Sequence, residues 1–346
     1  MDRQNNFDLL RLLAALSVIF SHAFLLAENS QDRDPLMMLT DGQAILGLAG
    51  VFVFFTISGY LVTQSFEHTR PPLLFLAKRG LRIFPGLIAC LLVCALTIGP
   101  LVTELPLAEY FAQPKTWLFV LHNAVLDVEY NRLPGVAFAP TNIGGIVNGP
   151  LWSLPCEALL YLMVFALGLC RLLTLRTTLV LLAVGIGAAW LDTAGETFGS
   201  ALWLLGFFAA GMCCYKLRGH PRLIDGRWAL LALVGLALSI PAHAFLLAFP
   251  LCGGYLVIYL ALNRRIPVVP AARWGDLSYG LYIYGWPIEQ CVVWASQGEA
   301  PWWAVFAISV VITVPTAFAS WHLVEKRCRM PPRPRPALAM AGASAN

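Results

Sequence analysis

A histidine and a glutamate fall at matching depth in two strongly apolar segments of the chain. His22 lies near the end of FDLLRLLAALSVIFSHAF, and Glu157 lies in GPLWSLPCEALLYL. At about 1.5 Å per helical residue, both side chains come roughly 7–10 Å below the outer surface of a bilayer. Ionisable groups at such depth are costly, and an imidazole beside a carboxylate is typical of general-base chemistry. We therefore predict that His22 and Glu157 are catalytic. The alternatives are a purely structural contact between them, or a Glu157 that is bonded to another helix.

Arginines form a second candidate set, toward the other side of the membrane. Arg11 precedes His22 with ten residues between them, which places it about 16 Å away on the same helical face. The segment FLAKRGLRIFP adds three cations at the beginning of the third apolar segment. Arginine forks suit phosphate oxygens, although a basic cluster also contacts lipid headgroups, and Arg11 could pair with Asp8. The residues predicted to bind a phosphorylated co-substrate are Arg11, Lys78, Arg79 and Arg82.

A third set is aromatic and polar. The segment GDLSYGLYIYGWPIEQ spreads three tyrosines through one apolar run and ends on a glutamate and a glutamine. Aromatic belts at the bilayer surface account for Trp286, but tyrosines spaced along a whole span indicate hydrogen bonding within a cavity. The residues predicted to line a substrate cavity are Tyr282, Ser153, Trp152 and Glu289.

The elements that position these residues follow from composition. Hydrophobic residues make up 59% of the 346 residues and charged residues only 12%, whereas soluble domains carry roughly a quarter charged residues. Apolar runs of about 17–23 residues recur between polar breaks, the length that crosses a bilayer as a helix. We predict an all-α, polytopic integral membrane protein of about ten transmembrane helices, at roughly 7–27, 46–66, 83–103, 150–171, 177–193, 198–215, 228–241, 243–262, 274–296 and 302–324.

Charge sets the orientation of these helices. With ten spans and a cytoplasmic N-terminus, most lysine and arginine residues fall in the cytoplasmic segments, as the positive-inside rule requires, and the outer segments hold several acidic residues but only Arg33, Lys115 and Arg132 as basic ones. Both termini are then cytoplasmic, and the net charge of +4 is a topology signal rather than a sign of nucleic-acid binding. The apolar stretch Thr116–Leu126 is too short to span and is expected at an interface.

Residues 1–330 form one predicted membrane domain, and the Pro-, Ala- and Arg-rich residues 331–346 a disordered cytoplasmic tail. No cleavable signal peptide is apparent. The nine cysteines show no metal-ligand spacing, so we expect no metal site.

Several segments together resemble the acyltransferase-3 family of membrane O-acyltransferases. They are FDLLRLLAALSVIFSHAF, GVFVFFTISGYLV with FLAKRGLRIFPG, GPLWSLPCEALLY, SYGLYIYGWPI and WHLVEK, in the family's order. The family's arginine and histidine of the first span fall on Arg11 and His22, and its paired arginines on Arg79 and Arg82. Two features depart from many relatives: Gly285 stands where they carry histidine, and no outer soluble domain is present.

The resemblance implies a ten-span enzyme of the bacterial inner membrane that moves an acyl group, commonly acetyl, from cytoplasmic acyl-coenzyme A. The implied acceptor is a hydroxyl of an extracytoplasmic glycan or glycolipid, with Tyr282 or Ser153 as oxyanion donor. Outer residues Trp117, Tyr130 and Asn142 are candidates for an acceptor platform. Expected partners are acetyl-coenzyme A, the acceptor and membrane lipids, without nucleic acid; a homo-oligomer is left open.

The main alternative is a transporter or flippase for a lipid-linked sugar or small anion, because intramembrane His, Glu and Arg also suit proton coupling. The sequence lacks the repeated broken helices that favour alternating access. A purely structural membrane component would leave His22 and Glu157 unexplained.

Overall fold

The computed structural model describes residues 5–138, 145–191 and 197–330, with the side chains of residues 197 and 198 left aside. Within these ranges the chain is helical, and no strand occurs. The longer helices are α1 (Phe7–Glu28), α3 (Leu46–His68), α4 (Pro72–Val93), α8 (Ser153–Leu169), α9 (Leu175–Trp190), α10 (Thr197–Lys216), α11 (Gly226–Ser239), α13 (Cys252–Leu262), α14 (Ser278–Ala295) and α15 (Trp302–Ser320). The prediction of an all-α fold is confirmed.

Shorter helical pieces extend or join these helices. They are α2 (Pro35–Leu39), η1 (Cys94–Ile98), α5 (Gly99–Val102), α6 (Leu107–Ala112), α7 (Pro114–Ala124), η2 (Gly149–Trp152), η3 (Pro221–Ile224), α12 (Phe245–Ala248), η4 (Ala271–Trp274), η5 (Trp321–Glu325) and α16 (Lys326–Cys328). Of these, η1 and η5 are π-helical turns that continue α4 and α15 without a break.

In the part of the chain that the structure describes, five helical segments are long and apolar enough to cross a membrane. They are Phe7–Glu28, Leu46–His68, Pro72–Val102, Gly149–Leu169 and Trp302–Cys328. Helices also lie at the other five predicted positions, and α9, α11 and α13 among them are apolar but shorter. The chain is therefore a multi-pass membrane protein, while the full number of ten spans stays a prediction.

The third segment begins eleven residues earlier than the hydropathy pattern predicts. Its helix runs from Pro72 through Val102, so Lys78, Arg79 and Arg82 lie within the helix rather than at its entrance. Long cationic side chains keep their heads in a polar environment while their stems lie along apolar surface, so charge does not end a helix. At about 1.5 Å per residue this segment is roughly 46 Å long and extends beyond the hydrocarbon layer.

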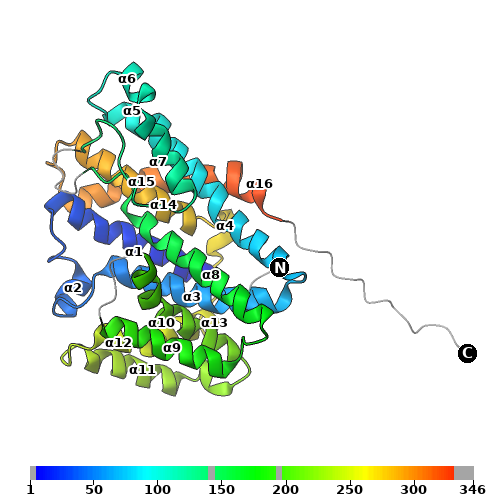
Figure 1. Ribbon diagram of the computed structural model, residues 1–346. Coiled ribbons are helices and arrows are strands. Elements are labelled where there is room, and N and C mark those ends of the chain that lie inside the picture. The colour runs from blue at the N-terminus through cyan, green and yellow to red at the C-terminus, as the bar shows by residue number, and fades with distance from the viewer. Residues whose placement is uncertain (1–4, 139–144, 192–196, 331–346) are drawn as a thin grey trace, which may run out of the picture.

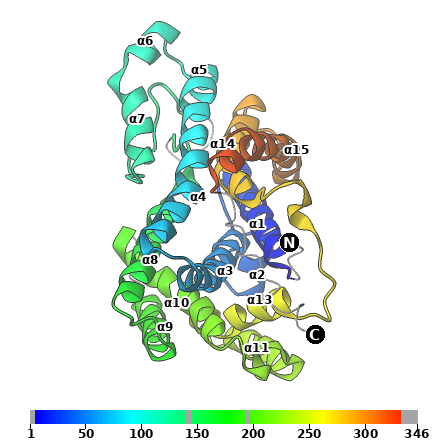
Figure 2. The same ribbon diagram turned by 90° about the vertical axis from the view of Figure 1, so that its right-hand side faces the viewer.

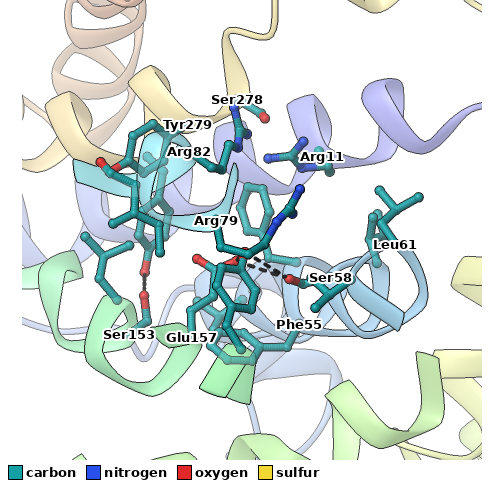
Figure 3. Close-up of a pocket in the computed structure, with 18 residues that line it drawn as sticks. Arg11, Phe55, Ser58, Leu61, Arg79, Arg82, Ser153, Glu157, Ser278 and Tyr279 are labelled. Carbon is teal, nitrogen blue, oxygen red and sulfur yellow. Dashed lines mark hydrogen bonds between the residues drawn. The ribbon is translucent and has the colours of Figure 1, made fainter. Parts of the chain in front are cut away.

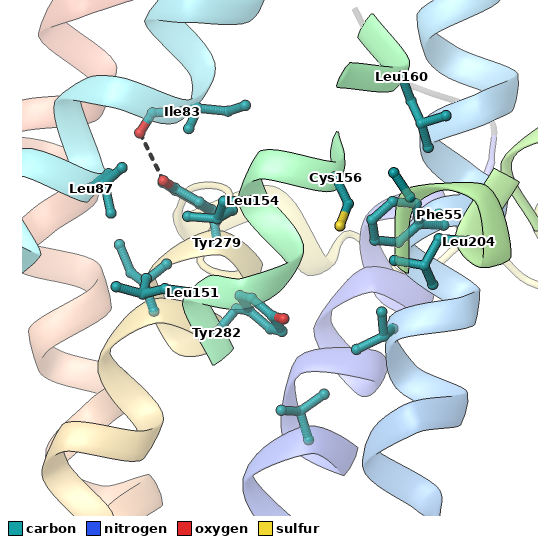
Figure 4. Close-up of a cluster of buried hydrophobic side chains, with 14 of the residues drawn as sticks. Phe55, Ile83, Leu87, Leu151, Leu154, Cys156, Leu160, Leu204, Tyr279 and Tyr282 are labelled. Atoms are coloured by element: carbon teal, nitrogen blue, oxygen red, sulfur yellow. Dashed lines mark hydrogen bonds between the residues drawn. The ribbon is translucent and has the colours of Figure 1, made fainter. Parts of the chain in front are cut away.

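Close helix contacts hold α3 against α10 in the middle of the bundle. A Cβ on Gly59 would overlap the carbonyl of Phe208, and a Cβ on Gly211 would overlap that of Thr56. Because water does not drive helices together within lipid, such small residues allow the close packing that stabilises the pair. Large apolar side chains fill the neighbouring space, among them Phe55 from α3 and Leu204 from α10 (Figure 4).

The connection between α5 and α8 returns along the bundle. Helices α6 and α7 flank the far end of α4–α5 on the side away from α14 and α15 (Figure 2), and Phe119 of α7 is buried. Asn131 and Asn148 exchange two hydrogen bonds, of 2.5 and 2.9 Å, and the Asn148 amide donates to Ile283 O of α14 at 2.8 Å. The predicted platform residue Asn142 lies outside the described residues.

Both described ends of the chain lie at one end of the bundle. Arg11 in the first turns of α1 and Arg329 after α16 contact the same carboxylate, that of Asp276. Helices α2 and α6 lie toward the opposite end (Figure 1). This arrangement agrees with two termini on one side of the membrane, and the cytoplasmic side remains the prediction from charge.

Candidate functional site

Five helices enclose a cavity of about 90 Å³, several times the roughly 10–15 Å³ that a water molecule needs. Helix α1 contributes Arg11, α3 Ser58, α4 the two arginines, α8 Glu157 and α14 Tyr279 (Figure 3). The predicted site residues that line this pocket together are Arg11, Arg79, Arg82, Ser153, Glu157 and Tyr282. Residues far apart in the chain thus meet at one polar cavity within an apolar bundle.

The α8 wall of the pocket is a ladder of hydroxyl and carboxyl groups. Ser153, Glu157 and Tyr161 are spaced four residues apart, so they share one face of the helix. Glu157 Oε1 accepts hydrogen bonds from the Tyr161 hydroxyl and from Ser58 Oγ, the latter at 3.1 Å. Ser153 Oγ lies 2.7 Å from the Tyr282 hydroxyl, which donates to Pro150 O at 3.0 Å. These groups can hydrogen-bond a polar, uncharged ligand.

Beside Arg11 and Arg82, at the end of the pocket away from Ser153, one carboxylate oxygen contacts three arginines. Asp276 Oδ2 lies 3.2 Å from Arg11 Nη1, 3.0 Å from Arg82 Nη1 and 3.3 Å from Arg329 Nη2. Its other oxygen accepts from Ser278 Oγ at 2.8 Å. Burial, together with the positive charge of Arg82, lowers the pKa of Arg329 to about 10. Three guanidinium groups share this one carboxylate, so their positive charges are only partly compensated.

Arg79 differs in its contacts from Arg82, which lies one helical turn further along α4. Among the described residues no carboxylate lies within 4.0 Å of it, and its buried Nε has no hydrogen-bond partner. Its guanidinium instead lies 5.7 Å from the ring centre of Tyr161 and 6.0 Å from that of Phe75. Cation–π contacts leave the N–H groups free to bind an anion. Lys78, also predicted to bind the co-substrate, donates to Thr69 Oγ1 at 3.4 Å and does not line the pocket.

His22 lies outside this pocket, and its carboxylate partner is Glu289. His22 Nδ1 is 3.7 Å from Glu289 Oε2, and the Trp286 ring meets the imidazole edge-on at 4.8 Å. The prediction that His22 pairs with Glu157 is therefore corrected. Two groups at equal depth need not share a side of their helices, and Glu157 turns toward the hydroxyls of Ser58 and Tyr161.

One face of α14 connects the pocket to the His22–Glu289 pair. Tyr279 and Tyr282 line the pocket, while Trp286 and Glu289, further along the same face, contact His22. Helix α14 packs along α1, which carries Arg11 at one end and His22 toward the other. The seam between α1 and α14 therefore runs from the arginines to the imidazole.

Close packing at this seam also accounts for Gly285. A Cβ there would approach Ile19 Cγ1 within 2.8 Å, which leaves no room for a larger side chain. Trp152, predicted as a cavity residue, does not line the pocket; it is half-buried against the apolar core.

Sequence reasoning missed four residues of the site. Tyr161 follows Glu157 by one helical turn, so helical spacing could have found it. Ser58 lies in the segment TISGYLV, and Asp276 opens GDLSYG, but neither stands out by type alone. Arg329 belongs to the basic residues that the sequence explains by topology alone. Its contact with Asp276, beside the pocket arginines, depends on the fold.

The described residues contain no group of three or more His, Cys, Asp or Glu side chains that could hold a metal ion. The nine cysteines all lie within the described ranges, and none of them forms a disulfide bond.

Comparison with known proteins adds a family and relatives. A family model described as "Acyltransferase domain" matches residues 4–322. The chain is 27% identical to the "O-acetyl transferase" of Shigella phage Sf6, covering 94% of this chain and 96% of that protein. It is 29% identical to "Nodulation protein 10" of Rhizobium leguminosarum bv. viciae, covering 93% and 92%. A protein of Komagataeibacter xylinus named as a membrane-bound transacylase is 26% identical, covering 94% and 83%. No solved structure matches.

Proposed function

Since the chain belongs to the acyltransferase-3 family and is a membrane O-acyltransferase, we propose that its donor is cytoplasmic acyl-coenzyme A, with acetyl as the transferred group. The proposed acceptor is a hydroxyl of a glycan or glycolipid on the opposite side of the bacterial inner membrane. The observation that carries the proposal is the α1–α14 seam, which leads from a cluster of arginines to a buried imidazole–carboxylate pair.

The arginine end suits the charged part of the donor. Phosphates cannot enter lipid, and the guanidinium of Arg79 is free of a carboxylate partner among the described residues. The pantetheine arm carries amide groups and no charge, so it can follow the hydroxyl ladder of Ser153, Glu157 and Tyr161. Glu157 would accept an amide N–H of this arm. Its proposed role is therefore donor positioning instead of partnership with the histidine.

The other end suits proton transfer. His22 Nδ1 faces the carboxylate of Glu289, which leaves Nε2 to take the proton of the acceptor hydroxyl. The hydroxyl oxygen attacks the thioester carbonyl, the carbon–sulfur bond breaks, and the proton passes to the departing thiolate. The products are the O-acyl ester and the free coenzyme thiol. Glu289 stabilises the imidazolium that exists between the two proton transfers.

Purified protein in lipid nanodiscs tests this function. Incubation with acetyl-coenzyme A labelled in the acetyl group, together with a candidate glycan, should release coenzyme thiol and transfer label to the glycan in equal amounts. His22→Gln protein is the matched control. A transporter or flippase would move its cargo without consuming thioester, so absence of thiol release with every acceptor offered would refute the proposal. Mass spectrometry of envelope glycans, with and without the protein, would identify the acceptor by a lost acyl mass.

A further inference from the structure

Arg329 reaches the pocket mouth from the far end of the described chain. We use this term for the arginine end of the pocket, where Asp276 contacts Arg11 and Arg82. Arg329 contacts Asp276 there and does not itself line the pocket. It follows α16, and its guanidinium lies 4.1 Å from the ring centre of Trp321 in the π-helical turn η5. The Trp321 ring in turn packs on Gly275, where φ is +118° and a Cβ would overlap the ring. Because Asp276 is the next residue, this packing sets its carboxylate 3.3 Å from Arg329 Nη2. The turn η5 that carries Trp321 is π-helical, and π-helical turns are frequent at functional sites.

Positive charge is in surplus at this mouth. Arg11, Arg79 and Arg82 line the pocket, and Arg329 joins two of them on Asp276. Two further carboxylates among the described residues lie close enough to act on the charge of Arg82: Glu325, which accepts a hydrogen bond from Ser320, and Glu157 on the α8 wall of the pocket. Four guanidinium groups facing three carboxylates keep a net positive charge, and the guanidinium groups repel one another in a low-dielectric environment. An anion with several charges would relieve that repulsion better than one aspartate.

We propose that Arg329 is a further donor-binding residue, which with Arg11, Arg79 and Arg82 forms a four-arginine site for the phosphates of a nucleotide donor. Asp276 is the internal counter-ion of this site, and the donor phosphates displace it from the arginines. The proposal rests on the proposed function, since it takes acyl-coenzyme A as the donor.

The geometry suits an exchange of one anion for another. The guanidinium groups of Arg11, Arg82 and Arg329 each contact Asp276 through one nitrogen, so their other N–H groups remain available to phosphate oxygens in a forked arrangement. Asp276 keeps its hydrogen bond from Ser278 Oγ at 2.8 Å and does not lose every partner on release. Arg329 is 37% exposed on its side chain, and it can move toward a ligand entering from water.

Binding of unacylated coenzyme A and of pantetheine to purified protein separates the possibilities. Arg329→Ala should weaken coenzyme A about three- to tenfold, the loss of one partly solvated charged contact, and leave pantetheine unchanged. Arg327→Ala is the matched control, because Arg327 is exposed two residues earlier. Equal coenzyme A affinity in wild-type and Arg329→Ala protein would overturn the assignment. An equal loss for both ligands would also overturn it, because pantetheine carries no phosphate.

Asp276→Asn tests the counter-ion. Removal of its charge should tighten coenzyme A binding several-fold, since the phosphates no longer compete with it. Weaker binding by folded Asp276→Asn protein would contradict the displacement, as would a folding defect that added coenzyme A fails to rescue. A wild-type protein that does not bind coenzyme A would instead refute the proposed donor, which distinguishes failure of the function from failure of this inference.

Discussion

The imidazole of His22 and the carboxylate of Glu289 face each other across the α1–α14 seam, with Nδ1 and Oε2 3.7 Å apart. Glu289 is fully buried, and neither of its oxygens has a hydrogen-bond partner among the described residues. A carboxylate so placed interacts more strongly with an imidazolium than with a neutral imidazole. In the proposed reaction, where His22 acts as general base, this carboxylate would stabilise the imidazolium that His22 becomes, and such differential stabilisation accelerates a chemical step.

Replacement of the base gives the first prediction. His22→Gln keeps hydrogen bonding and much of the volume but cannot carry a proton, so acyl transfer should fall at least about 100-fold. Coenzyme A affinity should stay unchanged, because Arg11 lies about 16 Å from His22 along α1, at the end of the seam where the other donor-binding arginines meet. Thiol release and coenzyme A binding are the two measurements. A well-folded His22→Gln enzyme with normal turnover would rule out the general-base role.

The second prediction concerns the positioning residue Glu289. Glu289→Gln preserves shape and removes the charge that supports imidazolium, so kcat should fall about 100-fold with little change in donor affinity. The melting temperature should not fall, because glutamine keeps the shape of a buried side chain whose oxygens have no hydrogen-bond partner among the described residues. Glu299→Gln, at an exposed carboxylate just beyond α14, is the control. Loss of stability in proportion to loss of activity would indicate a structural carboxylate instead.

The two arginines of α4 should differ, which is the third prediction. Arg79→Ala should weaken coenzyme A about tenfold at nearly unchanged melting temperature, since Arg79 has no carboxylate partner among the described residues. Arg82→Ala should in addition cost about 1–3 kcal/mol of stability, because Asp276 loses a partner. Binding and thermal denaturation, with Arg176→Ala as an exposed control, decide this. Identical behaviour of the two variants would contradict the distinction.

Topology is the fourth prediction. Tags inserted at Gln31 and Gln297 should be reachable by membrane-impermeant reagents in whole cells. Tags at His220 and at the C-terminus should react only after the cells are opened. A C-terminus labelled from outside would refute both the ten-span arrangement and a donor site on the cytoplasmic side.

The fifth prediction concerns packing of α3 on α10. Gly59→Ala should destabilise the protein by at least about 1–3 kcal/mol, because the added methyl group meets the backbone of Phe208. Gly187→Ala is the control: the same change occurs within α9, where a Cβ meets nothing within 4 Å. It should be neutral or stabilising by about 0.5–1 kcal/mol. Equal effects of both changes on stability would contradict the close approach of Gly59 to the Phe208 carbonyl.

Sequence by itself determined how far along each helix a residue lies. Apolar run lengths located ten helical segments, and helical rise placed Arg11 and His22 at opposite ends of the first one. Residue type identified six of the residues that line the pocket, namely Arg11, Arg79, Arg82, Ser153, Glu157 and Tyr282, and missed the hydroxyls of Ser58 and Tyr161. The hydropathy pattern indicates depth in the bilayer because polar groups are energetically costly within the hydrocarbon layer.

Tertiary structure alone decided which of these residues meet. Depth does not specify direction around a helix axis, so His22 and Glu157 match in level and yet contact different partners. Arg79 and Arg82 share a helical face, but only the latter reaches Asp276. Asp276 and Arg329 are 53 positions apart, and they meet because the turn after α15 brings the chain back over Gly275. Within lipid, packing between helices determines which residues are neighbours. The hydropathy pattern along the chain does not specify that packing.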